Sequence, residues 1–366
     1  MNIIKNNPLA KPFKTLTLLV VCFALPFGKA VADDEAGIIN LLFVGHEQRE
    51  GSGYHLSHVY APMLNQSLGH EKIRMEYHED LSLFTDEGLA QYDAVMLYAN
   101  YDELKPAQEK ALLDYVNNGG GFLPIHSASA CFGHSDNFVK LVGGRFHSHG
   151  YESFTTRTAP GQENHPIIRG FKNFETKDET YVHRDHNEDG RTVLMLREDE
   201  PWTWVREQGK GRVFYTAYGH DENTWGQLAF QDLLVRGILW SVGEEKRDAN
   251  RALVKSLPKA VYEDKGTIPN YRRVSPPPQF QNPLSAKDSE ALTMEELGFE
   301  LQLFVSEPDI VNPVAFTWDD RGRLFVVESV DYPNEVNPES KGNDRITMCE
   351  DTNGDGRADR CSVFAD

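Results

Sequence analysis

The feature that most constrains this chain is a regular alternation of apolar runs and helix-forming stretches in its first half. The runs IINLLFVGH (38–46), DAVMLYAN (93–100) and GFLPIHS (121–127) are continuous and apolar, as expected for strands buried on both faces. Between them, residues 55–68 have helical spacing, and Pro106 opens a second helix. Strands that alternate with helices predict a parallel α/β sheet covered by helices on both faces.

The pattern changes after this half. Residues 143–159 and 180–186 read as extended segments with loops, and 202–221 read as two strands joined by a Gly-Lys-Gly turn. An amphipathic helix over 225–243 closes the predicted domain.

The N-terminal residues 1–32 have the pattern of a secretory signal. Three lysines precede an apolar run over 15–27, and small residues favour cleavage after Ala32. The run is too short to span a bilayer comfortably, and no other stretch is long and apolar enough to be a transmembrane helix. We therefore expect an exported protein, periplasmic or extracellular.

The charge balance limits which partners the chain can bind, and the positions of the histidines indicate which part of the chain carries acid–base chemistry. The chain has 56 Asp and Glu against 37 Lys and Arg, a formal net charge of -19, so it should repel nucleic acid. All 13 histidines lie between His46 and His220, which confines the expected titratable chemistry to a first domain over 33–243.

The remaining chain divides into a linker and a β-rich segment. Residues 244–290 are charged and contain a proline run that should be stiff and extended. Within 291–366, the segments 299–308 and 314–329 read as short β segments. Short strands in so few residues cannot easily close a β-domain of their own, so we expect a longer polypeptide.

Three histidines follow predicted strands, namely His46, His126 and His220. Ligands of open α/β sheets bind at the carboxyl ends of the strands, so these side chains are expected to meet at one edge. A histidine there can act as an acid or base near neutral pH or contact a substrate.

The stretch GGGFLPIHSASACFGH has the place of a nucleophile elbow, but it matches the G-x-S-x-G pattern only at its serine. Ser127 is therefore either a nucleophile that also contacts substrate, or, with Ser129, a cap that accepts backbone N–H bonds of the next helix. Cys131 lies beyond the strand end and is expected to be buried.

The sequence FHSHG places His147 and His149 on one side of an extended segment. With His126 or His220 they could bind a divalent transition metal. The chain contains neither H-E-x-x-H nor C-x-x-C, so the metal prediction rests on this spacing alone.

Other candidates accompany these histidines. Glu179 could orient a histidine or bind sugar hydroxyls, or it could be an exposed loop charge. Asp221 follows His220 and suits proton transfer at the same edge. Tyr181 and Trp225 could contact substrate, although core packing explains buried aromatic residues equally well.

The loop DTNGDGRAD (351–359) has the spacing of a calcium loop. Its oxygen donors are Asp351, Asn353, Asp355 and Asp359, at positions 1, 3, 5 and 9. Position 12 is Ser362 rather than glutamate, so a bidentate ligand would have to come from elsewhere. Cys349 and Cys361 bracket the loop and could form a disulfide.

Several ordered motifs resemble the ThuA-like (trehalose utilisation) family. They are GGGFLPIHSASACF, LVGGRFHSHG, NHPIIRGF, KDETY, PWTW and GKGRVFYTAYGHDENTW, within residues 38–243. The resemblance implies a class I glutamine amidotransferase-like fold, which is a flavodoxin-like three-layer α/β/α sandwich. It also implies a role in carbohydrate metabolism, around disaccharides and keto-sugars, with His126, Glu179 and His220 as the polar site. The elbow cysteine of amidotransferases is absent, so glutaminase activity is not expected.

The segment LGFELQLFVSEPDIVNPVAFTWDDRGRLFVVES resembles the start of a glucose/sorbosone dehydrogenase-type β-propeller. It is similar to large exported membrane-bound dehydrogenase proteins, which continue into further propeller, helical and haem c modules. No C-x-x-C-H haem signature is present in this chain.

Three hypotheses of function follow. The first is an exported enzyme that acts on a sugar or keto-sugar through His126 or His220 as acid and base. The second is a glycan-binding module without chemistry of its own, attached to a propeller dehydrogenase. The third is a metal-dependent hydrolase that uses His147 and His149.

Overall fold

The computed structural model describes residues 36–46, 55–263, 280–331 and 342–366. The expected signal sequence at 1–32 and the proline run at 276–278 lie outside the described residues. Within the described ranges, no helix is both long and apolar enough to cross a membrane.

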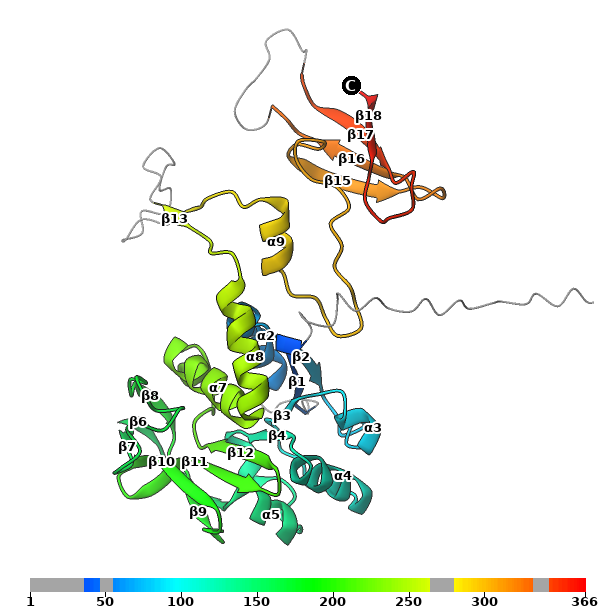
Figure 1. The fold of residues 1–366 in the computed structure, drawn as a ribbon. Helices are drawn as coiled ribbons and strands as arrows, with labels where there is room; N and C mark the ends of the chain where they lie inside the picture. Colours follow the sequence, from blue (N-terminus) through cyan, green and yellow to red (C-terminus); the bar gives the residue numbers. More distant parts are fainter. Residues whose placement is uncertain (1–35, 47–54, 264–279, 332–341) are drawn as a thin grey trace, which may run out of the picture.

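The first domain is built on an eight-stranded sheet whose parallel half matches the predicted alternation (Figure 1). In sheet order, the parallel strands are β2 (Ile73–His78), β1 (Ile39–Val44), β3 (Ala94–Leu97), β4 (Gly121–Pro124) and β12 (Gly211–Thr216). The order 2-1-3-4-5 of these strands is that of flavodoxin-like folds. The strands pair in parallel. β1, β3, β4 and β12 are almost wholly buried, whereas the edge strand β2 is half-buried along most of its length.

The other half of the sheet is antiparallel. It consists of β11 (Glu200–Gln208), β10 (Arg191–Arg197) and β7 (Arg157–Thr158). β11 and β12 form the hairpin expected from the Gly-Lys-Gly sequence, and Gly209 takes the positive φ of 60° that this tight turn requires. The parallel sheet predicted from the first half of the chain is therefore one half of a mixed sheet.

Two small antiparallel ribbons lie beside the main sheet. One pairs β5 (Arg145–Ser148) with β9 (Val182–Arg184), and the other pairs β6 (Tyr151–Thr155) with β8 (Glu175–Glu179). They correspond to the segments expected to be extended with loops, and they deliver several of the candidate side chains to the edge of the sheet.

Helices cover both faces of the sheet and give the three-layer arrangement (Figure 1). One face carries α2 (Ser57–His70), α7 (Leu228–Ser241) and α8 (Gly243–Ser256), and the other carries α3 (Asp86–Leu89), α4 (Pro106–Asn117) and α5 (Asp136–Val142). Pro106 occupies the first turn of α4, as its sequence predicts. The apolar side chains of strands and helices form one continuous core.

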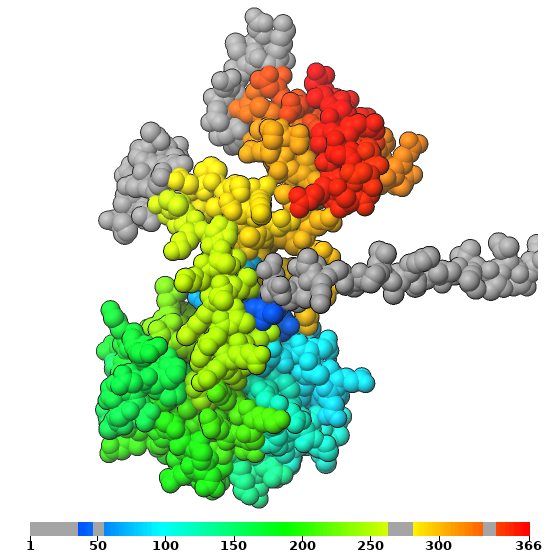
Figure 2. All heavy atoms as spheres, viewed as in Figure 1, coloured from blue at the N-terminus to red at the C-terminus, as the bar shows by residue number. Residues whose placement is uncertain are grey.

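The expected linker at 244–290 begins too early. Residues 243–256 form the helix α8, which runs along the first domain (Figure 2). Its Asn250 is fully buried, and the Asn250 amide donates hydrogen bonds to the backbone oxygens of Gly37 (3.0 Å) and Glu71 (2.8 Å). This buried amide and an ion pair between Lys246 and Asp93 (3.2 Å) hold the helix against the first domain, although most of its residues are polar. The charged composition of this segment therefore misled the prediction of a linker.

The residues that follow a short helix, α9 (Ala286–Leu292), contact the start of β2 and the residue before it. The Lys72 Nζ donates to the backbone oxygen of Thr293 (2.9 Å), and Arg74 forms an ion pair with Glu295. These contacts connect the first domain to the C-terminal segment.

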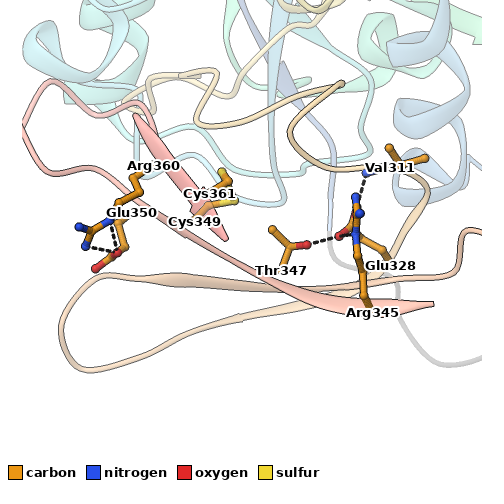
Figure 3. The surroundings of a disulfide bond; sticks show 8 residues. All are labelled: Val311, Glu328, Arg345, Thr347, Cys349, Glu350, Arg360 and Cys361. Carbon is orange, nitrogen blue, oxygen red and sulfur yellow. Dashed lines mark hydrogen bonds and ion pairs between the residues drawn. A yellow bond between two sulfur atoms is a disulfide. The ribbon is translucent and has the colours of Figure 1, made fainter. Parts of the chain in front are cut away.

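The C-terminal segment forms a four-stranded antiparallel sheet. Its strands are β15 (Pro313–Trp318), β16 (Leu324–Glu328), β17 (Arg345–Glu350) and β18 (Arg360–Ala365). Its buried apolar core is small, consisting of Leu324, Val326 and Cys349. Cys349 and Cys361 form the predicted disulfide between β17 and β18 (Figure 3). The β prediction is confirmed for 314–329 and wrong for 299–308, where the described chain is not in a strand.

Candidate functional site

Glu179 lies at the centre of a cluster of three histidines. Its Oε2 atom is 3.2 Å from Nε2 of His126, 3.3 Å from Nδ1 of His220 and 3.9 Å from Nε2 of His55. Nδ1 of His220 is also 3.3 Å from Nε2 of His55. One ligand-capable atom from each of these four side chains lies within 4.8 Å of the others.

Different elements bring the four residues together. His126 directly follows the β4 region and His220 follows β12, so both stand at the carboxyl edge of the parallel sheet. His55 comes just before α2, and Glu179 is the last residue of β8 in the neighbouring ribbon. The fold thus brings side chains from four segments that are distant in the sequence close together.

Hydrogen bonds fix which ring nitrogen faces the centre. Nδ1 of His126 lies 2.6 Å from the backbone oxygen of Ala217, and Nδ1 of His55 lies 2.6 Å from Oδ1 of Asn100. Since an oxygen acceptor needs a proton on Nδ1, each neutral ring directs the lone pair of its Nε2 toward Glu179. This is the arrangement that histidine ligands of metals commonly have.

Two of the four residues have an unfavourable backbone conformation. His55 and His126 have φ values of 55° and 49°, in the left-handed region that residues other than glycine rarely adopt. Such strain costs on the order of 1–3 kcal/mol and is concentrated at functional sites. The sharp turn after β4 is therefore present, but it presents His126 instead of a nucleophile.

Asp178 holds the loop that carries His220. Its carboxylate is fully buried and accepts hydrogen bonds from the backbone N–H groups of Gly219 (2.9 Å) and His220 (3.0 Å) and from Thr224 Oγ1 (2.7 Å). Burial raises the pKa of Asp178 to about 6, although these donors oppose the shift. Asp178 is thus a positioning residue for His220.

The pKa values of Glu179 and of the neighbouring histidines depend on one another. Burial alone would raise the pKa of Glu179, but the interactions of its carboxylate with the neighbouring His126, His220 and His55 outweigh burial and hold that pKa well below its usual range. Burial lowers the pKa of His126 to about 4. Burial also acts to lower the pKa of His220, but the Glu179 carboxylate raises it overall. The site therefore favours an ionised Glu179 next to a positive charge.

The cluster opens toward the surface on one side. His149 is 44 % exposed, and its Nδ1 lies 3.3 Å from Oε1 of Glu179. At the same rim, the hydroxyl of Tyr151 donates to Oδ2 of Asp221 (2.6 Å). A ligand that enters here would meet Glu179 and His220 before it reached the fully buried His126. A separate groove of about 880 Å³, lined by residues of α9 and β15, contains none of the cluster residues.

Comparison with known proteins decides the family. The model of the family described as "ThuA: Trehalose utilisation" matches residues 43–241, which is more than half of the chain. The chain belongs to the ThuA family. Residues 286–366 match a second family, described as a domain of unknown function, DUF7133. None of the curated proteins matches the chain.

Solved structures similar to this ThuA family protein include two ThuA-like proteins. The one from Parabacteroides merdae is 21 % identical with a TM-score of 0.49, and the match covers 56 % of this chain and 90 % of that one. The one from Bacteroides uniformis is 21 % identical with a TM-score of 0.47, covering 55 % and 90 %. A cytoplasmic protein from Salmonella typhimurium is 13 % identical with a TM-score of 0.41, covering 55 % and 98 %.

The structure of this ThuA family domain brings together His126, Glu179 and His220, as the resemblance implied, and it adds His55. His46 follows β1 as predicted, but among the described residues it is not part of the cluster. Its backbone N–H instead donates a hydrogen bond to Ser57 Oγ (3.2 Å).

Three expected substrate contacts are buried instead. Trp225 is fully buried, stacks on Tyr60 and donates from its Nε1 to the backbone oxygen of Gly219, so it belongs to the core. Tyr181 is 2 % exposed and stacks on the ring of His126 with centroids 4.1 Å apart. Ser127 is fully buried, and its Oγ has no hydrogen-bond partner among the described residues. In this conformation none of the three reaches a ligand at the rim.

The capping prediction for the serines is also wrong. No side chain caps the short 3-10 helix His126–Ala130, and Oγ of Ser129 donates to the backbone oxygen of His126 (3.0 Å). The next helix, α5, is capped by Ser135, whose Oγ accepts from the Phe138 N–H (3.0 Å). Ser129 thus supports the strained turn rather than starting a helix.

The metal pair predicted from FHSHG is not formed by the described residues. Among the described residues, His147 is exposed on β5 and joins no converging group, whereas Nδ1 of His149 lies 3.3 Å from the outer oxygen of Glu179 and 3.1 Å from the backbone oxygen of Gly150. Asp221 caps α6 (Glu222–Trp225) and accepts from Tyr151, so it lies on the rim beside the cluster. His147 lies within β5, whereas His149 follows the end of this strand, so the two histidines have different surroundings.

His55 and Asn100 were missed by sequence reasoning. Both lie in loops that follow parallel strands, and this position alone could have marked them, because such loops form the ligand-binding edge. His55 was assigned to the helix that begins after it, which hid its role.

The predicted calcium loop joins β17 to β18. Oδ1 of Asp351 accepts from the Gly354 N–H (2.6 Å) and Oδ2 from the Gly356 N–H (2.8 Å), while Asp359 accepts from Thr352. Gly354 and Gly356 have φ values of 81° and 83°, so glycine is needed at both turns. Calcium binding by this loop stays a prediction.

Proposed function

We propose that this ThuA family protein is an exported enzyme that acts on a sugar or keto-sugar at the cluster around Glu179. The observation that carries the proposal is the convergence of one carboxylate and three histidines at the carboxyl edge of the parallel sheet. The family description, trehalose utilisation, supports a carbohydrate as the substrate class.

The chemistry suited to this arrangement is proton transfer next to a carbonyl. A keto-sugar has a polarised oxygen and acidic C–H bonds beside it, so isomerisation or elimination requires groups that exchange protons at short range. Glu179 offers one carboxylate oxygen toward His220 and the other toward His149, and both histidines are partly exposed. His126 lies behind Glu179 and would orient it, so its proposed role changes from direct acid or base to positioning.

A thiol-dependent amidotransferase reaction is not supported. His126 occupies the turn after β4, and the nearest cysteine, Cys131, is buried with its Sγ 3.0 Å from the backbone oxygen of Ala99. Burial raises the pKa of Cys131 to about 12, and thiolates rather than thiols are nucleophiles.

The proposal is tested by incubating the purified chain with a panel of 3-keto-disaccharides and the parent disaccharides. We expect turnover of a keto-sugar that decreases at least 100-fold in His220→Ala and His126→Ala, whereas His147→Ala, on the exposed strand β5, retains it. Normal turnover by folded His220→Ala and His126→Ala would contradict the proposed site. Tight binding of a glycan without turnover across the panel would favour a binding module.

Export is a separate part of the proposal, supported by the N-terminal sequence pattern. Expression of the full chain in a bacterial host should give a periplasmic or secreted product whose N-terminus is Asp33. A product that retains residues 1–32 in the cytoplasm would contradict export.

For the C-terminal sheet, we propose that it is one blade of a propeller, as its sequence resemblance implies. A four-stranded antiparallel sheet is the repeating unit of such folds. A structure of a longer form of the protein in which β15–β18 pack in a closed ring of similar sheets would support this, and an isolated sheet there would contradict it.

A further inference from the structure

The cluster of His55, His126, Glu179 and His220 has the separations of a metal site. In a tetrahedral site with metal–nitrogen distances of about 2.0–2.1 Å, neighbouring ligand atoms are about 3.3 Å apart. The observed separations involving these atoms include 3.2, 3.3 and 3.3 Å, and the fourth is 3.9 Å. One ligand-capable atom from each of the four side chains thus lies within 4.8 Å of the others, a spacing that allows one ion to contact all four.

A second observation points to a cation at that point. Nε2 of His126 is fully buried, and no protein group donates to it, while its ring donates through Nδ1 to Ala217. The lone pair of Nε2 therefore faces a carboxylate oxygen 3.2 Å away. Two electron-rich atoms at this separation repel each other unless a positive charge lies between them.

The surroundings of the cluster match those of ligating histidines. A histidine ligand usually donates its other ring N–H to a carbonyl or carboxylate, which fixes the ring orientation. His126 has Ala217 as this partner and His55 has the side chain of Asn100. Both histidines also have positive φ values, an unfavourable backbone conformation that persists only where the surrounding structure holds it, as is common at functional sites.

We propose that His55, His126, Glu179 and His220 bind one divalent first-row transition-metal ion. Three imidazoles and a carboxylate suit Zn²⁺, Mn²⁺ or Fe²⁺, whereas Ca²⁺ and Mg²⁺ prefer sites composed of oxygen donors. This site differs from the pair His147 and His149, of which only His149 approaches the cluster.

The ion would replace the proton that otherwise balances the charge of Glu179. Its role in turnover rests on the proposed function: the ion would polarise the carbonyl oxygen of a keto-sugar entering from the side of His149. The three clustered histidines would then be ligands, and His149, beside the outer oxygen of Glu179, would be the group placed to exchange a proton with substrate. Metal binding itself does not depend on the identity of the substrate.

The test uses the full chain, purified without a histidine tag or chelator. Elemental analysis should find about one equivalent of zinc, manganese or iron. After removal of the metal, titration with Co²⁺ should give a visible absorption spectrum that saturates at one equivalent and disappears when Zn²⁺ is added.

Variants identify the ligands. Glu179→Gln and His220→Ala should each weaken Co²⁺ binding at least 100-fold, and Asn100→Ala, which removes only the support of His55, should weaken it about 10–100-fold. His147→Ala is the matched control on the neighbouring ribbon and should bind as the parent does. Asn100→Ala keeps the test informative if a ligand variant does not fold.

The outcomes separate the two proposals. Metal binding at this cluster without carbohydrate turnover supports the metal site and contradicts the proposed function. Turnover by a protein that neither contains nor binds a metal overturns the metal site and leaves the proposed function standing. Binding of Co²⁺ that is unchanged in Glu179→Gln, His220→Ala and Asn100→Ala also overturns the assignment of these ligands.

Discussion

Oε2 of Glu179 lies 3.2 Å from Nε2 of His126, although Glu179 ends the strand β8 and His126 begins the short 3-10 helix that follows β4. The Nε2 atom is buried and its ring donates to Ala217 through the other nitrogen, so this contact requires a proton or a cation to be stable. The contact makes Glu179 the residue on which the other candidate side chains depend.

Replacement of Glu179 by glutamine should abolish turnover while leaving the fold intact. The amide keeps the volume of the side chain but has no negative charge and cannot accept a proton, so kcat/KM for a 3-keto-disaccharide should decrease about 100- to 10,000-fold. Glu175→Gln, an exposed position on the same strand, is the control and should behave as the parent. Equal activity of both variants, measured with folded protein, would exclude Glu179 from the reaction.

Asp178→Asn should destabilise the protein and displace His220. The two carboxylate oxygens of Asp178 accept hydrogen bonds from Gly219, His220 and Thr224, whereas an asparagine has only one acceptor oxygen. A buried N–H group therefore loses its partner in the variant. We expect a loss of about 1–3 kcal/mol in the free energy of unfolding, measured with urea, and a lower kcat. Asp199→Asn, at a fully exposed carboxylate, should change neither. Identical urea midpoints for the two variants would show that Asp178 does not anchor the loop.

Cys131 should be unreactive in the folded protein and should make stability depend on alkaline pH. Burial raises its pKa from 9.0 to about 12, so the folded state keeps the proton while the unfolded state releases it as the pH exceeds about 9. The contribution of the Cys131 thiol to the free energy of unfolding is complete below the pKa that the thiol has in the unfolded chain, and it is lost as the pH rises toward 12. Relative to Cys131→Ala, the parent should lose about 1 kcal/mol per pH unit between pH 9.5 and 10.5.

Alkylation with iodoacetamide provides the independent check on Cys131. Modification should be undetectable at pH 8 in native protein and complete after denaturation, because the thiol is buried and donates to Ala99. Rapid modification of the native protein would show that Cys131 is an accessible thiolate and would reopen the search for a nucleophile.

Removal of the Cys349–Cys361 disulfide should unfold the C-terminal sheet before the first domain. The bond closes a loop with a sequence separation of 12 residues, for which chain entropy predicts about 3 kcal/mol of stabilisation. The small core offers little compensation, although Glu328 is buried and bonded by Arg345 (2.9 Å) and Thr347 (Figure 3). In the double serine variant, hydrogen exchange should increase in β17 and β18 but not in β1. Unchanged protection of β17 would contradict this role.

Much of the fold follows from local patterns in the sequence. Continuous apolar runs predict β1, β3 and β4 because strands buried on both faces contain few polar residues, and the hairpin of β11 and β12 follows from its glycines. The sequence does not predict helix α8 because its attachment depends on tertiary contacts that composition does not reveal, among them the buried amide of Asn250 and the ion pair between Lys246 and Asp93.

The site was predictable only in part. His126 and His220 follow strands, and parallel strands bring their carboxyl ends together, so their proximity follows from topology. His55 belongs to the cluster and His46 does not, and this difference depends on the directions of two side chains that follow β1. The spacing of residues in the sequence does not determine these directions. The burial of Trp225 against Tyr60 likewise depends on packing and not on its position in the sequence.

The most direct test of the account is a crystal structure of the full chain soaked with a 3-keto-disaccharide. We predict that the sugar binds at the rim formed by His149 and Tyr151, with its carbonyl oxygen directed toward Glu179 and His220 or toward an ion that they hold. A sugar bound with high occupancy at another surface, with the cluster unaltered, would contradict the central claim that this cluster is the carbohydrate site.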